Sequence, residues 1–442
     1  MLGYSYNYLS PENFLLPEAY VQDGLLAPNR QAFKALIVRA NDSLTVPGVE
    51  RLVDFANAGL PIVFSGGIPQ DLLGYNTTGT SYVRQALVGL VESENVHIVP
   101  YENLAVSLAN LGITPRTKVS ADRPLYTYWR EDSNASVSYA FVYNDGWDSD
   151  IGEGAAKGTI TFDTSGVPYS YDAWTGEIAP ILAYQTSSAG VTIPMTLAGN
   201  QSAIVAFHHN ETVPSGTRML STPAEVHSAT ASEDGDSSTI TLKFGNTTGS
   251  VLLSNGTTLA LPIPPASYNL TAWNLTIESW TQPDDPETDQ TKSKKANSTY
   301  ALQSLEPWNQ ISDTLRNVSG RGFYTTSFTW PPANTTGAEV DASGAMLDLG
   351  AILNTARCWV NGQQLPPLDP TAARADIGAY LQEGENEVAI VVTTTLGNAL
   401  IPFTEEVRSS GTLWLGPEPT EQEYGLVFPV VVVPYAETTV GW

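Results

Sequence analysis

Residues 136–143, Ser-Val-Ser-Tyr-Ala-Phe-Val-Tyr, decide the fold class, because Val137, Tyr139, Phe141 and Tyr143 alternate with smaller residues. A period of two places successive side chains on opposite faces, so this segment predicts a half-buried β-strand. Similar short runs recur at 159–162, 203–207, 239–244, 323–329, 346–349, 388–392 and 427–433, separated by Gly, Pro, Asn and Asp. Many short strands without intervening helices are typical of antiparallel β-sandwiches.

Residues 1–115 follow a different pattern. Apolar runs at 35–38, 61–65 and 96–99 alternate with helical patterns at 49–58, 82–91 and 104–111. Pro47 stands where a first helical turn tolerates proline, and Gly59 stands where the first helix would end. Strand, helix and strand in succession predict a parallel sheet with right-handed crossovers, which we interpret as a flavodoxin-like α/β layer. The alternation of Tyr4, Tyr6 and Tyr8 predicts a further strand near the start of the chain.

The length of 442 residues suggests about three domains. We place an α/β domain at 1–115, a β-sandwich at 116–230 and a second β-sandwich at 231–442. Residues 281–298 are polar and contain proline, which predicts an exposed loop. The predicted fold class is therefore α+β and multidomain.

The charge excludes several classes of partner. Lys and Arg total 20 against 46 Asp and Glu, a net charge of −26. Such a chain repels phosphate backbones and anionic lipid, so we expect neither nucleic acid nor a membrane as partner. No apolar run reaches the roughly 18 residues that a membrane span needs. The acidic charge fits a neutral polyol or sugar better.

The cysteine and asparagine counts concern the cellular compartment. The single cysteine, Cys358, excludes a disulfide framework and a cysteine-based zinc site. Twelve of the 25 asparagines stand in Asn-x-Ser/Thr, where chance would give about five. They are Asn41, Asn76, Asn134, Asn200, Asn210, Asn246, Asn255, Asn269, Asn274, Asn297, Asn317 and Asn334. The excess predicts a secreted, N-glycosylated eukaryotic protein. The alternative is that a β-protein rich in Ser, Thr and Asn accumulates such sequences by chance.

No signal peptide is visible at the start of the chain. The first residues show neither a basic region nor an apolar run. We expect either that a signal peptide was removed or that the chain is the C-terminal part of a longer protein.

One loop concentrates polar side chains. Residues 144–153 contain Asp145, Asp148, Asp150 and Glu153, whose oxygens are candidate Ca²⁺ ligands. The alternative is a solvated turn, and we expect no other cofactor. Trp147 in the same loop is a candidate platform for stacking on a sugar ring; alternatively, it folds back over the sheet edge.

Trp174 and Trp359 are further candidate sugar contacts. The stretch 357–362, Arg-Cys-Trp-Val-Asn-Gly, predicts a strand with Cys358 and Val360 on one face. A type I′ turn follows at Asn361-Gly362. The folding interpretation places Trp359 in the core together with Trp273, Trp280 and Trp330.

No catalytic residue can be predicted. The sequence contains neither Gly-x-Ser-x-Gly nor His-Glu-x-x-His. A glycosidase needs two carboxylates on either side of the scissile bond, and 46 acidic residues single out no pair.

Several segments together resemble the region that follows the catalytic barrel in the family 106 α-L-rhamnosidases and their fungal relatives. They lie at 4–13, 35–38, 49–58, 59–69, 127–130, 140–144, 171–178, 273–280 and 322–328. Segments 347–350, 357–362, 376–381 and 384–387 are similar to a galactose-binding-like jelly roll. The resemblance implies that the acid and base carboxylates belong to an upstream catalytic barrel. It therefore carries over no catalytic residue.

The first hypothesis is thus a C-terminal accessory region of a secreted glycoside hydrolase, with carbohydrate and the upstream barrel as partners. A non-catalytic secreted carbohydrate-binding or adhesion protein is the second. The third is a complete enzyme whose site lies between the α/β layer and the first sandwich.

Overall fold

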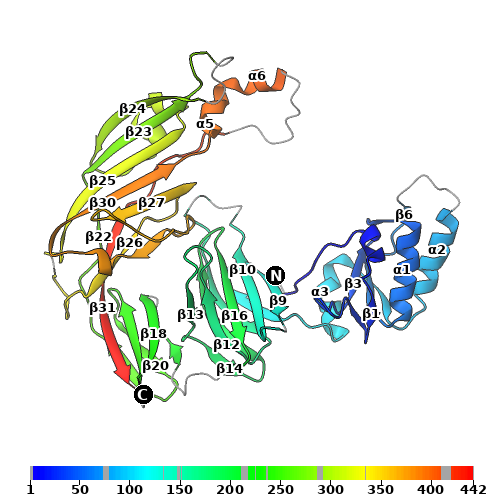
Figure 1. The fold of residues 1–442 in the computed structure, drawn as a ribbon. Coiled ribbons are helices and arrows are strands. Elements are labelled where there is room, and N and C mark those ends of the chain that lie inside the picture. Colours follow the sequence, from blue (N-terminus) through cyan, green and yellow to red (C-terminus); the bar gives the residue numbers. More distant parts are fainter. Residues whose placement is uncertain are drawn as a thin grey trace. The chain divides into compact units, whose positions relative to one another are not determined.

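The computed structural model describes residues 3–72, 79–132, 134–146, 150, 152–210, 218–223, 225–234, 237–285, 292–333, 335–409 and 420–441. Most of them form antiparallel sheets with few helices, as the strand-rich sequence predicts (Figure 1). The chain falls into two compact units. The first comprises Met1–Val119, Tyr126–Ala140 and Thr161–Asp163; the second comprises Ser120–Leu125, Phe141–Ile160 and Thr164–Trp442.

The first unit contains a three-stranded parallel sheet. Its strands β3 (Leu36–Arg39), β5 (Ile62–Ser65) and β7 (Val96–Val99) pair in that order. The connections carry α1 (Val46–Asn57) and α2 (Gly79–Leu90), and α3 (Leu104–Asn110) follows β7. All six elements match sequence predictions. The Thr45 hydroxyl accepts a hydrogen bond from Gly48 N at 3.1 Å and caps α1, and Gly59 follows the helix with φ +88°.

Helices cover both faces of this sheet. Phe64 of β5 packs in one core with Leu52 of α1 and Leu87 of α2. Val63, whose side chain points to the opposite face, packs in another core with Leu108 of α3. A strand that is buried on both faces has a continuous apolar sequence, which explains why β5 could be located from its apolar run.

The start of the chain differs from the prediction. Residues 3–10 form no strand, and Tyr6 and Tyr8 are 59% and 82% exposed. The hydroxyl of Tyr4 instead donates a hydrogen bond to Ile113 O at 2.8 Å. The remaining short elements before residue 100 are η1 (Pro11–Leu15), β1 (Val21–Gln22), β2 (Leu25–Leu26), β4 (Ser43–Leu44) and β6 (Asp71–Leu72).

Strands between residues 117 and 208 form two sheets. Their orders are β13-β12-β16-β10-β9 and β14-β15-β11-β8. The bounds are β8 (Thr117–Ala121), β9 (Leu125–Asp132), β10 (Val137–Asn144), β11 (Ala156–Phe162), β12 (Val167–Tyr171), β13 (Ile178–Pro180), β14 (Gln185–Ser187), β15 (Gly190–Leu197) and β16 (Ser202–His208). In β10, Ala140 and Val142 are fully buried, whereas Phe141 is 42% exposed. The alternation correctly predicts the strand, but the larger side chains lie on the less buried face.

A small β-subdomain follows, with its own core. It comprises β17 (Met219–Ser221), β18 (Val226–Asp234), β19 (Ser237–Phe244), β20 (Gly249–Leu253) and β21 (Thr258–Leu261). Met219, Leu242, Phe244 and Val251 pack together in this core with Ala436 of β31 (Val431–Gly441). Residues 231–261 therefore pack in a different core from the sandwich that follows them, although we placed both in one domain.

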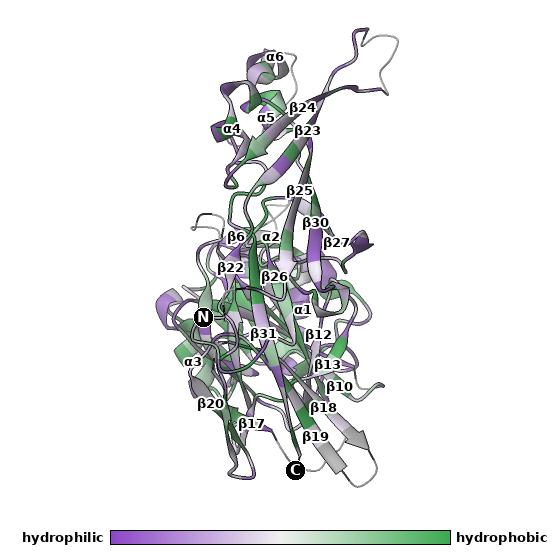
Figure 2. Cartoon of the chain, turned by 90° about the vertical axis from the view of Figure 1, so that its left-hand side faces the viewer, coloured by the Kyte–Doolittle hydropathy of each residue, from purple (hydrophilic) through white to green (hydrophobic). Residues whose placement is uncertain are grey.

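The last sandwich has two sheets. One has the order β24-β23-β25-β30-β27-β28, and the other continues from β19 through β31 and β26 to β29. The bounds are β22 (Tyr268–Asn269), β23 (Trp273–Thr281), β24 (Lys294–Leu302), β25 (Gly320–Trp330), β26 (Gly344–Asp348), β27 (Thr355–Val360), β28 (Gln363–Gln364), β29 (Arg374–Asp376) and β30 (Gly384–Thr393). Leu275, Tyr324 and Ile390 of one sheet share a core with Leu347 and Val432 of the other. Hydrophobic and hydrophilic residues are mixed along the same strands, as expected of strands with one buried face (Figure 2).

Three details differ from the predicted pattern. Residues 294–298, which we placed in the polar loop, begin the edge strand β24, whose first four residues are exposed. The last strand begins at Val431 rather than at 427. Short helices also interrupt the β-rich part, namely α4 (Trp308–Ile311), η3 (Asp313–Leu315), η4 (Gly378–Tyr380), α5 (Gly397–Leu400), η5 (Ile401–Phe403) and α6 (Thr404–Ser409), in addition to η2 (Tyr101–Asn103) in the first unit.

Candidate carbohydrate-contact sites

Trp359, a candidate sugar contact, and Trp280, which the sequence predicts in the core, lie on the outer face of the sheet that contains β23 and β27. Trp280 of β23 and Trp359 of β27 are half-buried there. The prediction that both belong to the core was wrong, because alternation along β27 points Cys358 inward and Trp359 outward. Trp273 and Trp330 are buried, as predicted.

A charged cluster accompanies Trp280 on this outer face. Glu278 Oε1 accepts hydrogen bonds from Arg321 Nη2 at 2.8 Å and Trp280 Nε1 at 2.7 Å, and Lys295 Nζ lies 3.6 Å away. These hydrogen bonds, with Arg321 first, hold the pKa of Glu278 below its ordinary value. The carboxylate is therefore a hydrogen-bond acceptor in its charged form and is unsuited to act as a general acid.

The hairpin after β27 has the predicted turn. Asn361 and Gly362 have φ values of 51° and 75°, which fit a type I′ turn. Asn361 Nδ2 donates to Asn386 Oδ1 at 2.8 Å, and Asn361 Oδ1 accepts from Glu387 N at 2.9 Å. Burial raises the pKa of Cys358 to about 12, so its thiol is an inert core group.

The polar loop after β10 is anchored by a buried amide. Asn144 Nδ2 lies 2.8 Å from Gly154 O and 2.9 Å from Ala198 O, so it ties the loop to the turn before β16. A Cβ added to Gly146 would lie 2.7 Å from Gly199 Cα, so glycine permits the two backbones to approach. Part of the polar composition of this loop thus has a structural role.

The candidate calcium ligands are only partly described. Asp145 is half-buried, and Asp150 and Glu153 are exposed. Asp148 and Trp147 lie outside the described residues. Within the described part of the chain, no group of three or more His, Cys, Asp or Glu side chains is placed to hold a metal ion. The calcium site stays a prediction.

Trp174 lies at the tip of the β12–β13 hairpin and is 47% exposed. The Asp172 carboxylate accepts hydrogen bonds from Trp174 N at 2.7 Å and Thr175 N at 3.2 Å, and Gly176 has φ +77°. Asp172 and Gly176 therefore build the turn, whereas the indole contributes an open aromatic surface.

A polar cluster that the sequence analysis did not predict lies on the sheet of β19, β31 and β29. Lys243 Nζ lies 2.6 Å from Asp376 Oδ2, and the Tyr435 hydroxyl donates to Asp376 Oδ1 at 2.9 Å. Burial opposes the charged form of Asp376, but hydrogen bonds from Lys243, Gly378 N and Tyr435 lower its pKa. The three side chains come from strands far apart in sequence, so no local motif could reveal them.

His227 belongs to β18, an edge strand of the same sheet. Its ring nitrogens are 3.3 and 3.4 Å from Arg374 Nη2. Burial, followed by the Arg374 charge, lowers the pKa of His227 to about 4. The imidazole is therefore neutral near pH 7.

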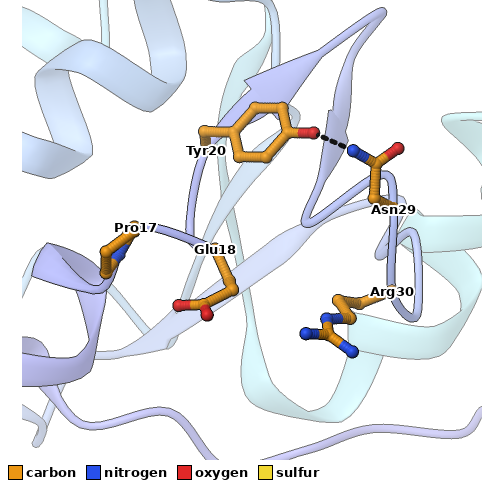
Figure 3. A pocket seen from close by; sticks show the side chains of 5 residues that line it. All are labelled: Pro17, Glu18, Tyr20, Asn29 and Arg30. Carbon is orange, nitrogen blue, oxygen red and sulfur yellow. Dashed lines mark hydrogen bonds between the residues drawn. The ribbon is translucent and has the colours of Figure 1, made fainter.

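A hollow of about 310 Å³ lies in the first unit (Figure 3). Pro17, Glu18, Tyr20, Asn29 and Arg30 line it, and Asn29 Nδ2 donates to the Tyr20 hydroxyl at 2.6 Å. Glu18 and Arg30 extend into the same open space. Three of its five lining residues, Glu18, Asn29 and Arg30, are polar or charged, whereas ligand pockets are lined predominantly by apolar and aromatic side chains with few polar groups.

The asparagines of the Asn-x-Ser/Thr sequences share one property. All ten that the structure describes are exposed, whereas only six of the thirteen other asparagines are. Asn76 and Asn334 lie outside the described residues. A glycan cannot be buried, so every described site meets the first requirement for modification.

Comparison with solved structures gives a match that spans nearly all of this chain. The chain is similar in fold to a bacterial rhamnosidase. The rhamnosidase from Novosphingobium sp. PP1Y superposes with a TM-score of 0.57 at 17% identity, covering 99% of this chain and 36% of that chain. The resemblance stated from the sequence is thus supported at the level of fold.

Other solved structures match only in part. The FMN-binding β-glucuronidase from Faecalibacterium prausnitzii L2-6 has a TM-score of 0.24 at 15% identity, covering 40% of this chain and 23% of that one. The β-D-mannosidase from Dictyoglomus thermophilum has a TM-score of 0.21 at 13% identity, with coverages of 38% and 22%. No argument rests on these two. No protein-family model and no curated protein matches the sequence.

None of the described helices is long and apolar enough to cross a membrane.

Proposed function

We propose that this chain is a non-catalytic accessory region of a secreted glycoside hydrolase similar to the fungal relatives of family 106 α-L-rhamnosidases. The observation that carries the proposal is the fold match over 99% of this chain to 36% of a rhamnosidase. The catalytic carboxylates would then belong to a separate barrel. In this proposal residues 1–115 are a flavodoxin-like layer, and the last sandwich is a galactose-binding-like jelly roll.

The described acidic groups support a non-catalytic role. A glycosidase keeps one carboxylic acid protonated by raising its pKa. The pKa values of Glu278 and Asp376 are both lowered, because hydrogen bonds from Arg321 and Lys243 respectively stabilise the charged form. Their position favours structural ion pairs over proton transfer.

A hydrolysis assay tests the proposal. The purified 442-residue chain is expected to release no product from aryl α-L-rhamnosides. Turnover that is abolished by one Asp or Glu substitution would overturn it. Glu278→Gln and Asp376→Asn should leave any residual turnover unchanged, because both carboxylates lie in structural ion pairs.

A secreted carbohydrate-binding protein is the second candidate, and the exposed indole of Trp174 is the observation that favours it. Titration with rhamnose and galactose, followed by tryptophan fluorescence, separates the candidates. Saturable binding that Trp174→Ala removes while the melting temperature stays unchanged would favour this second function. If the tryptophan fluorescence does not change when sugar is added, the accessory role is favoured, in which Trp174 binds no sugar.

A further inference from the structure

One asparagine of an Asn-x-Ser/Thr sequence lies on the aromatic outer face described above. Asn274 of β23 is exposed, while its neighbours Trp273 and Leu275 point into the core. The register pairs Asn274 with Thr325 of β25, and it pairs the next outward residue of β23 with Phe323. Phe323 is therefore the diagonal cross-strand neighbour of Asn274 on the same face. Such neighbours lie about 7–8 Å apart, within reach of large side chains.

On one side, Phe323 has a cationic neighbour from its own strand. The guanidinium carbon of Arg321 lies 5.4 Å from the centre of the Phe323 ring. Arg321 and Thr325 flank Phe323 on the same face, and Asn274 pairs with Thr325. Asn274 consequently lies on the side of Phe323 that faces away from Arg321. Phe323 is half-buried, so part of its apolar surface is exposed to solvent.

We propose that Asn274 carries an N-glycan whose first sugar packs against Phe323, so that this face is occupied by the protein's own glycan. The inference rests on the secretory origin proposed above. The donor would be an oligosaccharide linked to a polyprenyl diphosphate. Asn274 Nδ2 forms the bond to sugar C1, the C1–O bond to the diphosphate breaks, and the amide proton leaves with the diphosphate. The C–H face of a pyranose is apolar, so contact with the ring removes apolar surface from water.

Two other sites provide contrast. Asn297 of β24 pairs with Glu278, so its diagonal aromatic neighbour is Trp280. That indole is already covered, because Lys295 Nζ lies 4.5 Å and the Arg321 guanidinium 5.5 Å from its ring. Asn255 lies in the tight turn between β20 and β21, where its Oδ1 accepts a hydrogen bond from Thr257 N at 2.9 Å. Asn255 is therefore the matched control for a glycan attached to a turn.

The test uses the full chain, directed into the secretory pathway of a eukaryotic host. Glycopeptide mass spectrometry measures occupancy at each site, and calorimetry measures Tm. Asn274→Gln is expected to lower Tm by about 2–4 °C, the size of shift that one packing contact produces in a domain of this length. At the Asn255 site, Thr257→Ala removes the Asn-x-Thr sequence but keeps the hydrogen bond from Thr257 N to Asn255 Oδ1, and it is expected to leave Tm unchanged. In a Phe323→Thr background, Asn274→Gln should have no further effect, because the ring that the sugar contacts is already absent.

A second experiment avoids the Phe323→Thr substitution in β25. Trimming the wild-type glycans to their first sugar should preserve Tm, whereas complete removal should lower it, and the Asn274→Gln protein should not respond to either treatment. Glycans at Asn41 and Asn255 with a bare Asn274 would overturn this inference and leave secretion standing, as would an equal loss of Tm in the Phe323→Thr background. If none of the described sites carried a glycan, that result would instead overturn the proposed secretion.

Discussion

The Tyr324 hydroxyl should contribute measurably to the stability of the last sandwich. Tyr324 is fully buried in β25, and its hydroxyl accepts hydrogen bonds from Trp308 Nε1 at 2.8 Å and Leu426 N at 3.2 Å. Trp308 and Leu426 are themselves about 1% exposed, so water cannot replace the lost acceptor. Burial raises the pKa of Tyr324 to about 12, and the hydroxyl therefore stays protonated over the ordinary pH range.

Tyr324→Phe removes only this oxygen. Each donor left unpaired in a buried site costs about 1–3 kcal/mol, so two donors should cost about 2–6 kcal/mol, and about 3 kcal/mol is a conservative value. For a domain of 150–250 residues, that loss lowers Tm by about 6–12 °C. Tyr268→Phe is the matched control, because among the described residues the buried Tyr268 hydroxyl has no hydrogen-bond partner. Tyr268 packs against the same core, and burial alone raises its pKa to about 12. Its replacement should be neutral or stabilising.

Scanning calorimetry of the two variants beside the wild-type chain measures the difference directly. Hydrogen exchange at the amide of Leu426 adds a local measure, since this N–H loses its acceptor only in Tyr324→Phe. The reasoning would be refuted if both variants shifted Tm equally. It would also be refuted if Tyr324→Phe had the same Tm as the wild type, because the Tyr324 hydroxyl would then not be the acceptor for Trp308 Nε1.

Three further substitutions follow from the same sheets. Gly362→Val should lower stability by about 1–3 kcal/mol, because a β-branched residue resists φ +75°, while Gly362→Asn should be tolerated; thermal melts distinguish the two. Trp359→Ala should cost about 1–2 kcal/mol in denaturant titrations, below the roughly 3–5 expected of a fully buried tryptophan, because Trp359 is only half-buried. His227 has a pKa of about 4 in the folded chain and an ordinary value of 6.5, so between pH 6.5 and 4 the unfolded chain binds one more proton, and the stability of the wild type falls as pH falls. His227→Gln should therefore flatten the curve of Tm against pH in this range. An unchanged slope would contradict the burial of the imidazole.

Periodicity located most of the secondary structure but not the direction in which the side chains point. The three parallel strands and three helices of the first unit were predicted because each is an apolar run or an amphipathic face, and most are bounded by proline or glycine. The same reasoning failed at Tyr4 to Tyr8, where alternation comes without pairing partners and no strand forms. In β10 the small Ala140 is buried and the larger Phe141 is 42% exposed. Size and apolarity alone do not say which face meets the opposing sheet.

The candidate sites could be predicted less well, because their geometry depends on pairing between distant strands. Trp280 and Glu278 are neighbours in one strand, but Arg321 joins them only through the β23–β25 register. Lys243 and Asp376 are 133 residues apart and meet at 2.6 Å across the sheet. Single-strand periodicity contains no information about either pairing, so charge partners and outward-facing aromatic residues become visible only in the structure.

Several polar residues in the segments that resemble the rhamnosidases have structural roles. This explains why the resemblance is supported at the level of fold but does not determine the function. Asp172 caps its own hairpin, and Asn361 and Asn386 bond to each other and to the backbone at the start of β30. Asn386 is fully buried, and its Nδ2 donates to Gln382 O at 2.8 Å. A buried amide that satisfies backbone groups is required wherever this turn exists, whatever ligand the domain binds. The presence of such residues therefore indicates the turn. Substrate choice depends instead on exposed groups such as Trp174, whose identity the fold does not constrain.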